Sequence, residues 1–401
     1  MEKHKKVLII LGITASYILA VAVGGFISLC LATGWVPFFG GLGPGIGQSK
    51  LEELENIILQ QYIDGADPKV LEDAAAEAMV KATGDRWSYY IPADEYDEVM
   101  NNKNNTYVGI GITIMATQDG TGLEILKLEP EGPAREAGIL PGDILTAVEG
   151  QSVKDLGTNG AADLIQGEPG TFVNVEVLRE GESLTFTVER RQIQQQVATY
   201  EMLPDKVGYI KIVNFNTNCA KDTIAAVDAL IEQGAESLVF DVRFNPGGYT
   251  SELVEVLDYL LPEGPLFRGV DYLGNETLDE SDADCIDLPM AVLVNGDSYS
   301  AAEFFAAALQ EYDWATVVGE QTVGKSNFQY TLRLKDGSAV ALSTGHYFTP
   351  NGVNLTEAGG LTPDVVSEVD EDTAAKIYSD LLEPEEDPQL QDALAALKSG
   401  K

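Results

Sequence analysis

The hydrophobic period changes twice along this chain, and the two changes divide it into regions of different architecture. Apolar residues recur at helical spacing over 50–63 and 68–82, which predicts two amphipathic helices. From Tyr107 to about Arg191 the period is two, with turns marked by glycine, as in a series of short strands. After about residue 205, strand-like and helix-like runs alternate, which predicts an α/β layer domain.

The alternating region contains several short elements. Strands are expected at 207–213, 238–242, 290–295 and 316–319, and helices at 220–233, 251–261 and 301–310. Further short helices are expected at about 93–101 and 388–398. Because the chain has 401 residues, which is more than one ordinary core holds, these elements are expected to form two or three domains.

The N-terminal segment is apolar and has no charged residue between Lys6 and Lys50. Its stretch 7–33 exceeds the roughly 20 residues that cross a bilayer, and basic residues precede it. We therefore expect an uncleaved anchor with a cytoplasmic N-terminus and the rest of the chain outside the cytoplasm. A cleaved signal peptide is the alternative interpretation. Residues 36–48 are rich in glycine and proline, as a flexible linker would be.

Charge and residue counts exclude some classes of function. Lys plus Arg is 25 and Asp plus Glu is 64, so the formal net charge is −39 and phosphate backbones are repelled. Nucleic-acid binding is therefore not expected. With His4 and His346 as its histidines and no Cys-x-x-Cys pair, the chain offers no His-rich metal site. Cys219 and Cys285 are interpreted either as a disulfide or as two separate thiols.

The middle region opens with two glycines spaced by one residue, within Tyr107-Val108-Gly109-Ile110-Gly111-Ile112. Such glycines let backbone amides turn inward and hold a carboxylate. Two later stretches, 133–145 and 164–171, read as a helix that turns into a strand and as a second helix with its own turn. The alternative is a small β-barrel whose glycines serve only its turns.

Two strand ends in the α/β region carry features of an acyl-transfer site. The strand at 238–243 ends in Asn245-Pro246-Gly247-Gly248, where paired glycines permit close approach of a ligand to backbone amides. The strand at 290–295 leads through a turn of small residues to Ser300 at a helix N-terminus. There a serine nucleophile has the amide of Ala301 beside it to bind an oxyanion. Taken singly, these features are also typical of a plain turn and of a helix N-cap.

Lys325 lies in a turn flanked by glycine, after the predicted strand at 316–319. A lysine is a general base only when neutral, which requires burial that lowers its pKa. Gln329 follows four residues later, where it is able to orient the lysine by hydrogen bonding. His346 is the rival base, and we interpret it as structural.

With these motifs in place, residues 50–400 resemble the C-terminal processing (tail-specific) serine peptidases, and 107–191 resembles a PDZ domain. That family has a serine in a small-residue turn, a lysine 25 positions later and a glutamine four positions after that, and Ser300, Lys325 and Gln329 keep both spacings. The loop 245–248 is similar to the family's oxyanion loop, and 347–352 and 361–364 are similar to its later motifs.

The resemblance implies roles for individual residues. Ser300 attacks the scissile carbonyl, Lys325 takes its proton and Gln329 positions Lys325. The oxyanion is bound by the amides of Ala301, Gly247 and Gly248. Captured C-terminal tails add to the edge of the PDZ sheet. The PDZ residues expected to contact the tail are Val108, Gly109, Ile110, Gly111 and Ile112.

Together these inferences predict an α+β multidomain protein. The expected regions are a cytoplasmic stub and transmembrane helix (1–34), a linker (35–49), a helical region (50–105), a PDZ β-barrel-like domain (106–192), a ClpP/crotonase-like α/β peptidase core (193–382) and an acidic segment with a C-terminal helix (383–401). The expected function is a membrane-anchored serine endopeptidase acting on protein or peptide C-termini, without metal or organic cofactor, as a possible homodimer. The alternatives are a non-catalytic PDZ anchor that binds tails beside a relic core, and a cell-surface structural protein.

Overall fold

The computed structural model describes residues 49–117 and 119–399. The predicted anchor at 1–34 and the linker up to residue 48 lie outside them. Within the described residues, no helix has both the length and the apolar character that a membrane crossing requires. The chain divides into two compact units, one ending at Ala76 and one starting at Glu77.

The first unit contains the two helices expected from the helical spacing. Helix α2 (Lys50–Gln61) begins with a capping box, in which Ser49 Oγ accepts from the Glu52 amide and the Glu52 carboxylate accepts from the Ser49 amide. Helix α3 (Pro68–Lys81) runs across the unit boundary. Neither helix buries a residue in the described structure, so apolar side chains of α2 lie on its surface: Leu51, Leu54, Ile57 and Leu59.

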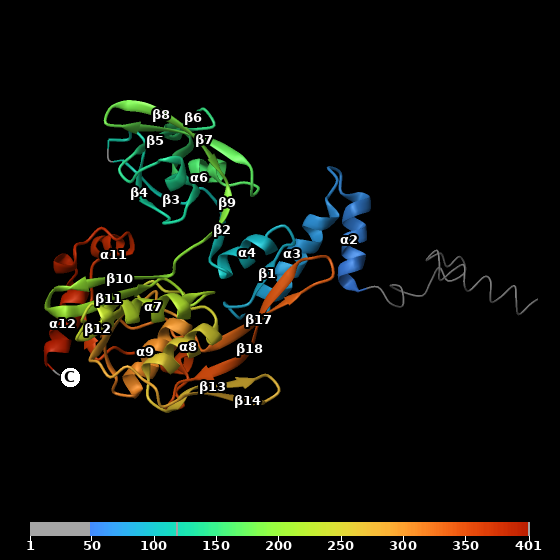
Figure 1. Ribbon diagram of the computed structural model, residues 1–401. Helices are drawn as coiled ribbons and strands as arrows, with labels where there is room; N and C mark the ends of the chain where they lie inside the picture. Colours follow the sequence, from blue (N-terminus) through green and yellow to red (C-terminus); the bar gives the residue numbers. More distant parts are fainter. Residues whose placement is uncertain (1–48, 118, 400–401) are drawn as a thin grey trace, which may run out of the picture. The chain divides into compact units, whose positions relative to one another are not determined.

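The region with a period of two folds into a small sheet with two helices. Strands β2 (Thr106–Gly109) and β9 (Arg191–Gln194) pair where the chain enters and leaves it, as Figure 1 shows. The sheet order is β3-β4-β5-β7-β8, with β6 beside β5, so β3 is an edge strand. The remaining elements are β3 (Ile112–Ala116), β4 (Leu123–Leu128), α5 (Pro133–Ala137), β5 (Ile144–Val148), β6 (Gln151–Ser152), α6 (Val153–Ile165), β7 (Phe172–Arg179) and β8 (Glu182–Glu189).

The second half of the chain is built on a six-stranded sheet in the order β10-β11-β12-β15-β16-β19. All neighbours run parallel except β10 and β11, which are antiparallel. Each strand predicted from the alternating pattern is present, and no end differs by more than one residue. The strands are β10 (Ala198–Leu203), β11 (Val207–Ile212), β12 (Ser237–Asp241), β15 (Met290–Val294), β16 (Ala315–Gly319) and β19 (Val365–Val366).

Helices cover both faces of this sheet, which explains why its strands read as continuous apolar runs. On one face Leu238 and Phe240 belong to a core shared with α7 (Cys219–Glu232), α8 (Thr250–Leu260) and α9 (Ala301–Glu311). On the other face Val239 packs with α12 (Pro388–Ser399). Alternate residues of one strand therefore serve two different cores, as the pleat of a strand requires.

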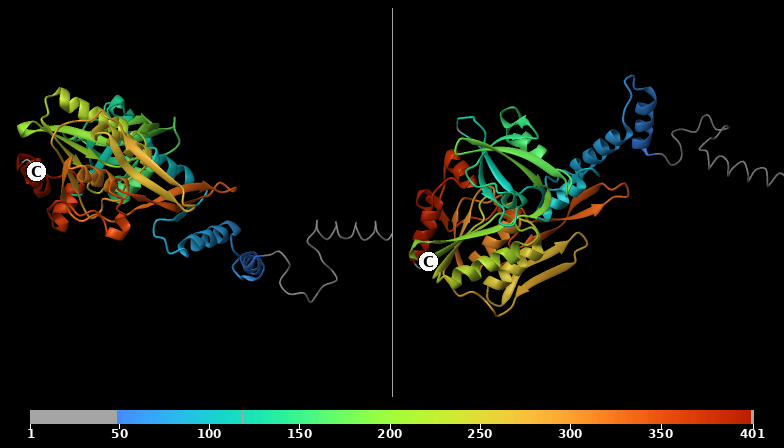
Figure 2. Two further views of the ribbon diagram at one scale, coloured as in Figure 1. Left: turned by 90° about the horizontal axis from the view of Figure 1, so that it is seen from below. Right: turned by 45° about the horizontal axis from the view of Figure 1, so that its top comes forward.

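A second sheet in the same unit is made of two long hairpins, drawn in gold and orange in Figure 2. Its order is β1-β18-β13-β14, and β17 also pairs with β18. The elements are β1 (Tyr89–Ile91), β13 (Gly264–Asp271), β14 (Glu276–Ser281), β17 (Asn327–Arg333) and β18 (Ala339–Phe348). Short helices complete the unit: α4 (Tyr96–Lys103), α10 (Leu355–Ala358), α11 (Glu371–Tyr378), and 3-10 turns at Pro204–Lys206 and Pro384–Glu386.

A buried ion cluster fixes the end of β12. The Arg243 guanidinium donates to the carboxylates of Asp241 and Asp387 and to Gln389 Oε1, and all four side chains are buried. Asp387 and Gln389 stand at the start of α12, so the C-terminal helix is tied to the strand that leads into the loop 244–248. Buried charges persist only when they are paired and hydrogen-bonded in this way.

Candidate active site

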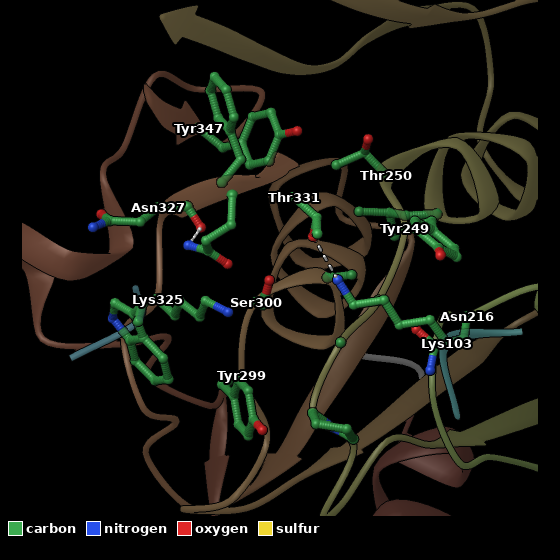
Figure 3. Close-up of a pocket in the computed structure, with 18 of the residues that line it drawn as sticks. Lys103, Asn216, Tyr249, Thr250, Tyr299, Ser300, Lys325, Asn327, Thr331 and Tyr347 are labelled. Carbon is green, nitrogen blue, oxygen red and sulfur yellow. Dashed lines mark hydrogen bonds between the residues drawn. The ribbon is translucent and has the colours of Figure 1, made fainter. Parts of the chain in front are cut away.

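The predicted site residues lie at the carboxyl ends of neighbouring parallel strands. The loop with Gly247 follows β12, Ser300 follows β15 and Lys325 follows β16, and these three strands are adjacent in the sheet. Parallel strands end at one edge, so loops that are distant in sequence meet there, which is where α/β proteins bind ligands. Figure 3 shows Lys325 extending toward Ser300. The structure therefore brings together the residues that were singled out separately in the sequence.

Ser300 stands at a sharp turn between β15 and α9. Its backbone has φ 59° and ψ −124°, a region that non-glycine residues rarely adopt. Ser298 has a different place: its side chain is buried, and its hydroxyl donates to the Val242 carbonyl. Of Ser298 and Ser300, Ser300 is thus the half-buried one that lines the pocket, and it has the strained backbone.

The glycine loop lies directly against this turn. A Cβ on Gly247 would come within 2.8 Å of the Ser300 Cβ and 2.8 Å of the Ala301 amide nitrogen, and its φ is +85°. A Cβ on Gly248 would lie 2.2 Å from the Phe215 carbonyl carbon. Both positions therefore need glycine: the first because the loop touches the nucleophile turn, the second because another backbone passes alongside.

The three amides predicted to bind an oxyanion are not equivalent. The Gly247 amide donates to Asn245 Oδ1 at 2.8 Å, inside its own loop. Among the described groups, no hydrogen-bond acceptor is found for the amides of Gly248 and Ala301. In this structure the amides of Gly248 and Ala301 are therefore the ones available to a ligand.

Lys325 is half-buried between aromatic rings. Its Nζ lies 4.6 Å from the centre of the Trp87 ring and 5.6 Å from that of Tyr299. Burial, followed by repulsion from Lys103, lowers the pKa of Lys325 from 10.5 to about 8, while Asp85 and Glu303 act in the opposite direction. In the described structure Lys325 Nζ and Ser300 Oγ are not hydrogen-bonded, which is common for catalytic pairs without substrate. The lowered pKa makes the neutral form, which a general base needs, a minor species near pH 7 and the main species above about pH 8.

Glu303 connects the turn at Ser300 with the loop at Lys325 by hydrogen bonds, although it was not singled out in the sequence. Its carboxylate is fully buried and accepts from the amides of Ser300, Gly324 and Lys325 and from the Thr322 hydroxyl. A Ser-x-x-Glu pair at a helix start is a capping-box pattern, so the sequence did contain a signal for it. Trp87 and Lys103 were also missed, and no local motif marks them, whereas Tyr299 directly precedes Ser300 in the predicted turn.

Gln329 lines the same pocket, but its hydrogen bonds lead elsewhere. Its Nε2 donates to the Asn327 carbonyl at 3.0 Å and to Ser343 Oγ at 3.1 Å. In the described structure it makes no hydrogen bond to Lys325, so the expected direct contact is absent. His346 is exposed and does not line the pocket, but its Nδ1 lies 3.1 Å from Oδ1 of Asn327, which does. The structural role of His346 stays a prediction.

The pocket has a volume of about 690 Å³, a size typical of sites that hold small ligands or peptide side chains. Beside Ser300 and Lys325, one part of its wall is aromatic, with Phe267, Phe304 and Tyr347. Such a wall suits an apolar substrate side chain.

The five predicted PDZ residues span the end of β2, the two-residue link that follows it and the start of β3. Val108 and Gly109 belong to β2 and pair with β9. Ile110 is buried and its carbonyl accepts from Ala134, while Gly111 has φ +78° and its carbonyl accepts from Glu129. Ile112 begins the edge strand β3. The second glycine thus turns the chain from the β2–β9 pair into the edge of the sheet.

The cysteines that are described are separate thiols. Cys219 is buried and Cys285 is partly buried, and both are free. Burial raises the pKa of Cys219 to about 12, so its thiol is not ionised at neutral pH. Throughout the described residues, no group of three or more His, Cys, Asp or Glu side chains is arranged to hold a metal ion.

Comparisons with known proteins identify relatives of this chain. Residues 206–367 match peptidase family S41, and residues 124–179 match the PDZ domain family. The carboxy-terminal processing protease CtpA of Bacillus subtilis is 30% identical over 377 residues, which cover 92% of this chain and 78% of that protein. The carboxyl-terminal-processing protease of Synechocystis sp. is 30% identical over 333 residues, covering 81% and 77%.

A solved structure shares the fold. The crystal structure of a putative S41 protease from Bacteroides fragilis superposes with a TM-score of 0.57 at 17% identity, covering 90% of this chain and all of that one (100%). The chain belongs to peptidase family S41 and is a carboxy-terminal processing serine peptidase with a PDZ domain.

Proposed function

We propose that Ser300 and Lys325 are the nucleophile and the general base of this peptidase. The observation that carries the proposal is that both residues follow the carboxyl ends of adjacent parallel strands. The lysine is half-buried there, and its pKa is lowered to about 8. Neutral Lys325 takes the hydroxyl proton as Ser300 Oγ attacks the scissile carbonyl, and the tetrahedral oxyanion forms against the amides of Ala301 and Gly248. Lys325 then gives the proton to the leaving amine. Water, activated by the same lysine, hydrolyses the acyl-enzyme.

Gln329 is proposed to act on Lys325 through its strand. Its amide ties Asn327 to Ser343, and thereby holds the start of β17, two residues after Lys325, against β18. A Gln329→Glu variant keeps the length of the side chain but loses the amide donor. We expect a lower kcat with little change in KM, since the lysine is displaced but the pocket remains.

The dyad is tested by cleavage of an unstructured protein that ends in apolar residues. Purified full-length enzyme, Ser300→Ala, Lys325→Met and the exposed-lysine control Lys376→Met are compared. Cleavage lost in the first two variants and kept in the third supports the assignment, since Lys376 lies on the surface of α11. Cleavage that survives Ser300→Ala would show that another residue is the nucleophile.

The PDZ domain is proposed to capture substrate tails on the free edge of β3. The support is that β3 pairs with β4 on one side only, and that Ile110–Ile112 lead into its start. Extended C-termini bind such edges by adding a strand. The test uses the Ser300→Ala enzyme, which does not consume its ligand, and one apolar peptide with a free or amidated C-terminus. Tighter binding of the free acid supports the proposal; equal binding opposes it.

Membrane anchoring through residues 1–34 is proposed from the sequence. Its support is the uncharged run from Val7 to Thr33 and the lysines that precede it. Alkaline extraction of membranes from cells that express the full chain tests it, together with N-terminal sequencing of the product. A protein that leaves the membrane with a new N-terminus near residue 34 would identify a cleaved signal peptide.

A homodimer is proposed through α2. Its support is the set of exposed apolar side chains, Leu51, Leu54 and Ile57, on a helix that buries no residue in the described structure. Light scattering of the full chain in detergent should give twice the protein mass of one chain. Leu54→Lys should reduce it to a single chain.

A further inference from the structure

The active-site pocket carries a charge opposite to that of the chain as a whole. The chain has 64 acidic and 25 basic residues. Yet the residues that line the pocket include no aspartate or glutamate, and they include three cations, Arg86, Lys103 and Lys325. A cleft of one sign within a strongly opposite field concentrates ligands of the complementary charge. A negatively charged group of a ligand would therefore find side chains of complementary charge in this lining.

Two of the three cations are already accounted for. Lys325 is the proposed base, and its pKa is lowered so that it gives up its charge. The Arg86 guanidinium lies over the Trp87 ring, 4.3 Å from its centre. Lys103 has no role so far. It is the last residue of α4, on the side of the pocket away from Lys325, and in the view of Figure 3 Ser300 lies between the two amines.

Lys103 is held over the pocket by its own backbone. Its carbonyl accepts from the amide and the hydroxyl of Thr217, each at 3.3 Å. Two residues later, the side chain of Asn105 exchanges hydrogen bonds with that of Asn214 and donates to the Thr217 carbonyl. These contacts fix the end of α4 to the peptidase core, so the position of the lysine does not depend on a flexible loop.

The ammonium group of Lys103 makes fewer hydrogen bonds than it has N–H donors. It has three N–H donors, and it makes one hydrogen bond, to Thr331 Oγ1 at 3.3 Å. Within the described residues it forms no ion pair. The side chain is half-buried, and burial lowers its pKa. A partly desolvated cation with unused donors at the reacting centre is an incomplete ion pair, which a ligand oxygen would complete.

We propose that Lys103 binds a carboxylate of the substrate inside the active-site pocket. This deepens the proposed function and rests on it: the peptidase would favour a carboxylate within a few residues of the bond that Ser300 attacks. Two sources offer the same chemistry, the free C-terminus of a short tail and the side chain of an aspartate or glutamate. In both cases the carboxylate displaces no protein partner except the contact with Thr331.

The test compares matched peptides with the full-length enzyme. One pair differs only in a free or amidated C-terminus, and a second pair differs only in glutamate or glutamine near the cleaved bond. For each enzyme the ratio of kcat/KM within a pair is measured at one pH. We expect the wild type to favour the carboxylate peptide of one pair by about tenfold or more, the size of a charge-assisted hydrogen bond. Lys103→Met should remove that preference and Lys103→Arg should keep it.

The ratio separates this proposal from other effects of the substitution. If Lys103 acted only by repelling the proton of Lys325, Lys103→Met would slow both peptides of a pair equally, and the ratio would not change. Carboxylate preference that arises in the PDZ domain would persist in Lys103→Met. An unchanged ratio of kcat/KM in both pairs therefore overturns the proposal. Loss of the preference in one pair supports it and shows whether the carboxylate comes from the C-terminus or from a side chain. Failure of the Ser300–Lys325 assignment has a different signature, because Ser300→Ala would then still cut both peptides.

Discussion

The backbone amides of Ser300 and Lys325 donate to the same atom, Oε2 of Glu303, at 2.9 and 2.8 Å. The two proposed catalytic residues are 25 positions apart in sequence, yet one carboxylate oxygen sets the separation of their backbones. The other oxygen accepts from Gly324 and Thr322, so the carboxylate is saturated by protein donors. Glu303 is thus a positioning residue: it touches neither substrate nor the reacting atoms.

This relationship predicts the effect of Glu303→Gln. The amide NH₂ of glutamine would face backbone donors, so the two loops would separate or one donor would lose its partner. We expect kcat to fall by about a hundredfold, with a smaller change in KM, because positioning errors of about 1 Å cost this much. Thr322→Val is the milder comparison, since three of the four donors remain. Equal kcat for Glu303→Gln and wild type would contradict the role given to Glu303.

The pH dependence of cleavage follows from the lowered pKa of Lys325. Because the neutral amine is the base, kcat/KM should rise with pH and level off above about 8. Since the pKa in the folded chain lies below the unfolded value, protonating Lys325 opposes folding, and stability should gain between about pH 8 and the ordinary lysine value. A pH–rate profile with a peptide that carries no titrating group checks the first expectation. A flat profile from pH 6 to 9 would exclude lysine as the base.

The contact of Lys325 with the Trp87 ring predicts how the midpoint of the pH–rate profile can be moved. Trp87→Ala should admit water to Lys325 Nζ, and because burial is the largest cause of the shift, the pKa should rise by about one unit. Activity at pH 7 should fall and should recover at pH 10. Loss of the cation–π contact acts in the opposite direction, so a midpoint that moves down would show that the ring attraction dominates. Trp87→Phe, which keeps an aromatic ring, should move the midpoint less.

The contact of Gly247 with the nucleophile turn predicts that Gly247→Ala is inactive. Its Cβ would press on the Ser300 Cβ and the Ala301 amide, both at 2.8 Å. Gly234→Ala is the matched control, because Gly234 has a similar φ of +91° with no atom within 4 Å of the added Cβ. Both variants share the cost of a left-handed alanine, about 1 kcal/mol. Melting curves should therefore show the backbone cost in both variants. Cleavage assays should show loss of activity in Gly247→Ala but not in Gly234→Ala.

The buried cluster at Arg243, which does not line the pocket, predicts a large effect on stability. Asp387→Asn would place an amide donor against the guanidinium, and breaking a buried pair costs about 3–5 kcal/mol. Asp205→Asn, which breaks the exposed pair with Lys398, should lower stability far less, because solvent screens that pair. Urea unfolding of the two variants measures the difference. Equal midpoints would mean that the buried pair of Arg243 and Asp387 stabilises the fold no more than the exposed pair does.

Much of the fold was predictable because its signals are local. The strands β12, β15 and β16 are buried on both faces, so each is a short apolar run between turns. The serine, the lysine and the glycine loop were found from their spacing, and adjacent parallel strands explain why they meet. Glu303 was within reach of the same reasoning, since it completes a Ser-x-x-Glu pattern at a helix start.

Other parts of the site depend on contacts between distant segments. Trp87 and Lys103 come from residues before the PDZ domain, and nothing in their neighbours shows that they line the pocket. Gln329 was expected to bind Lys325, but β17 directs its amide to Ser343 of the paired strand. The Gly247 amide is engaged by Asn245 through the local shape of the loop. Such details follow from the packing of strands and loops, which spacing alone does not specify.

The link between Arg243 and Asp387 also has a consequence for the order of events during synthesis. The two residues are 144 positions apart, so the ribosome releases the glycine loop long before the partner that anchors its strand. Until residues 387–389 emerge, Arg243 has Asp241 but lacks the two groups that complete its shell. A growing chain thus has the nucleophile turn before Arg243 has its full set of partners, and we expect proteolytic competence to wait until residues 387–389 have joined the fold.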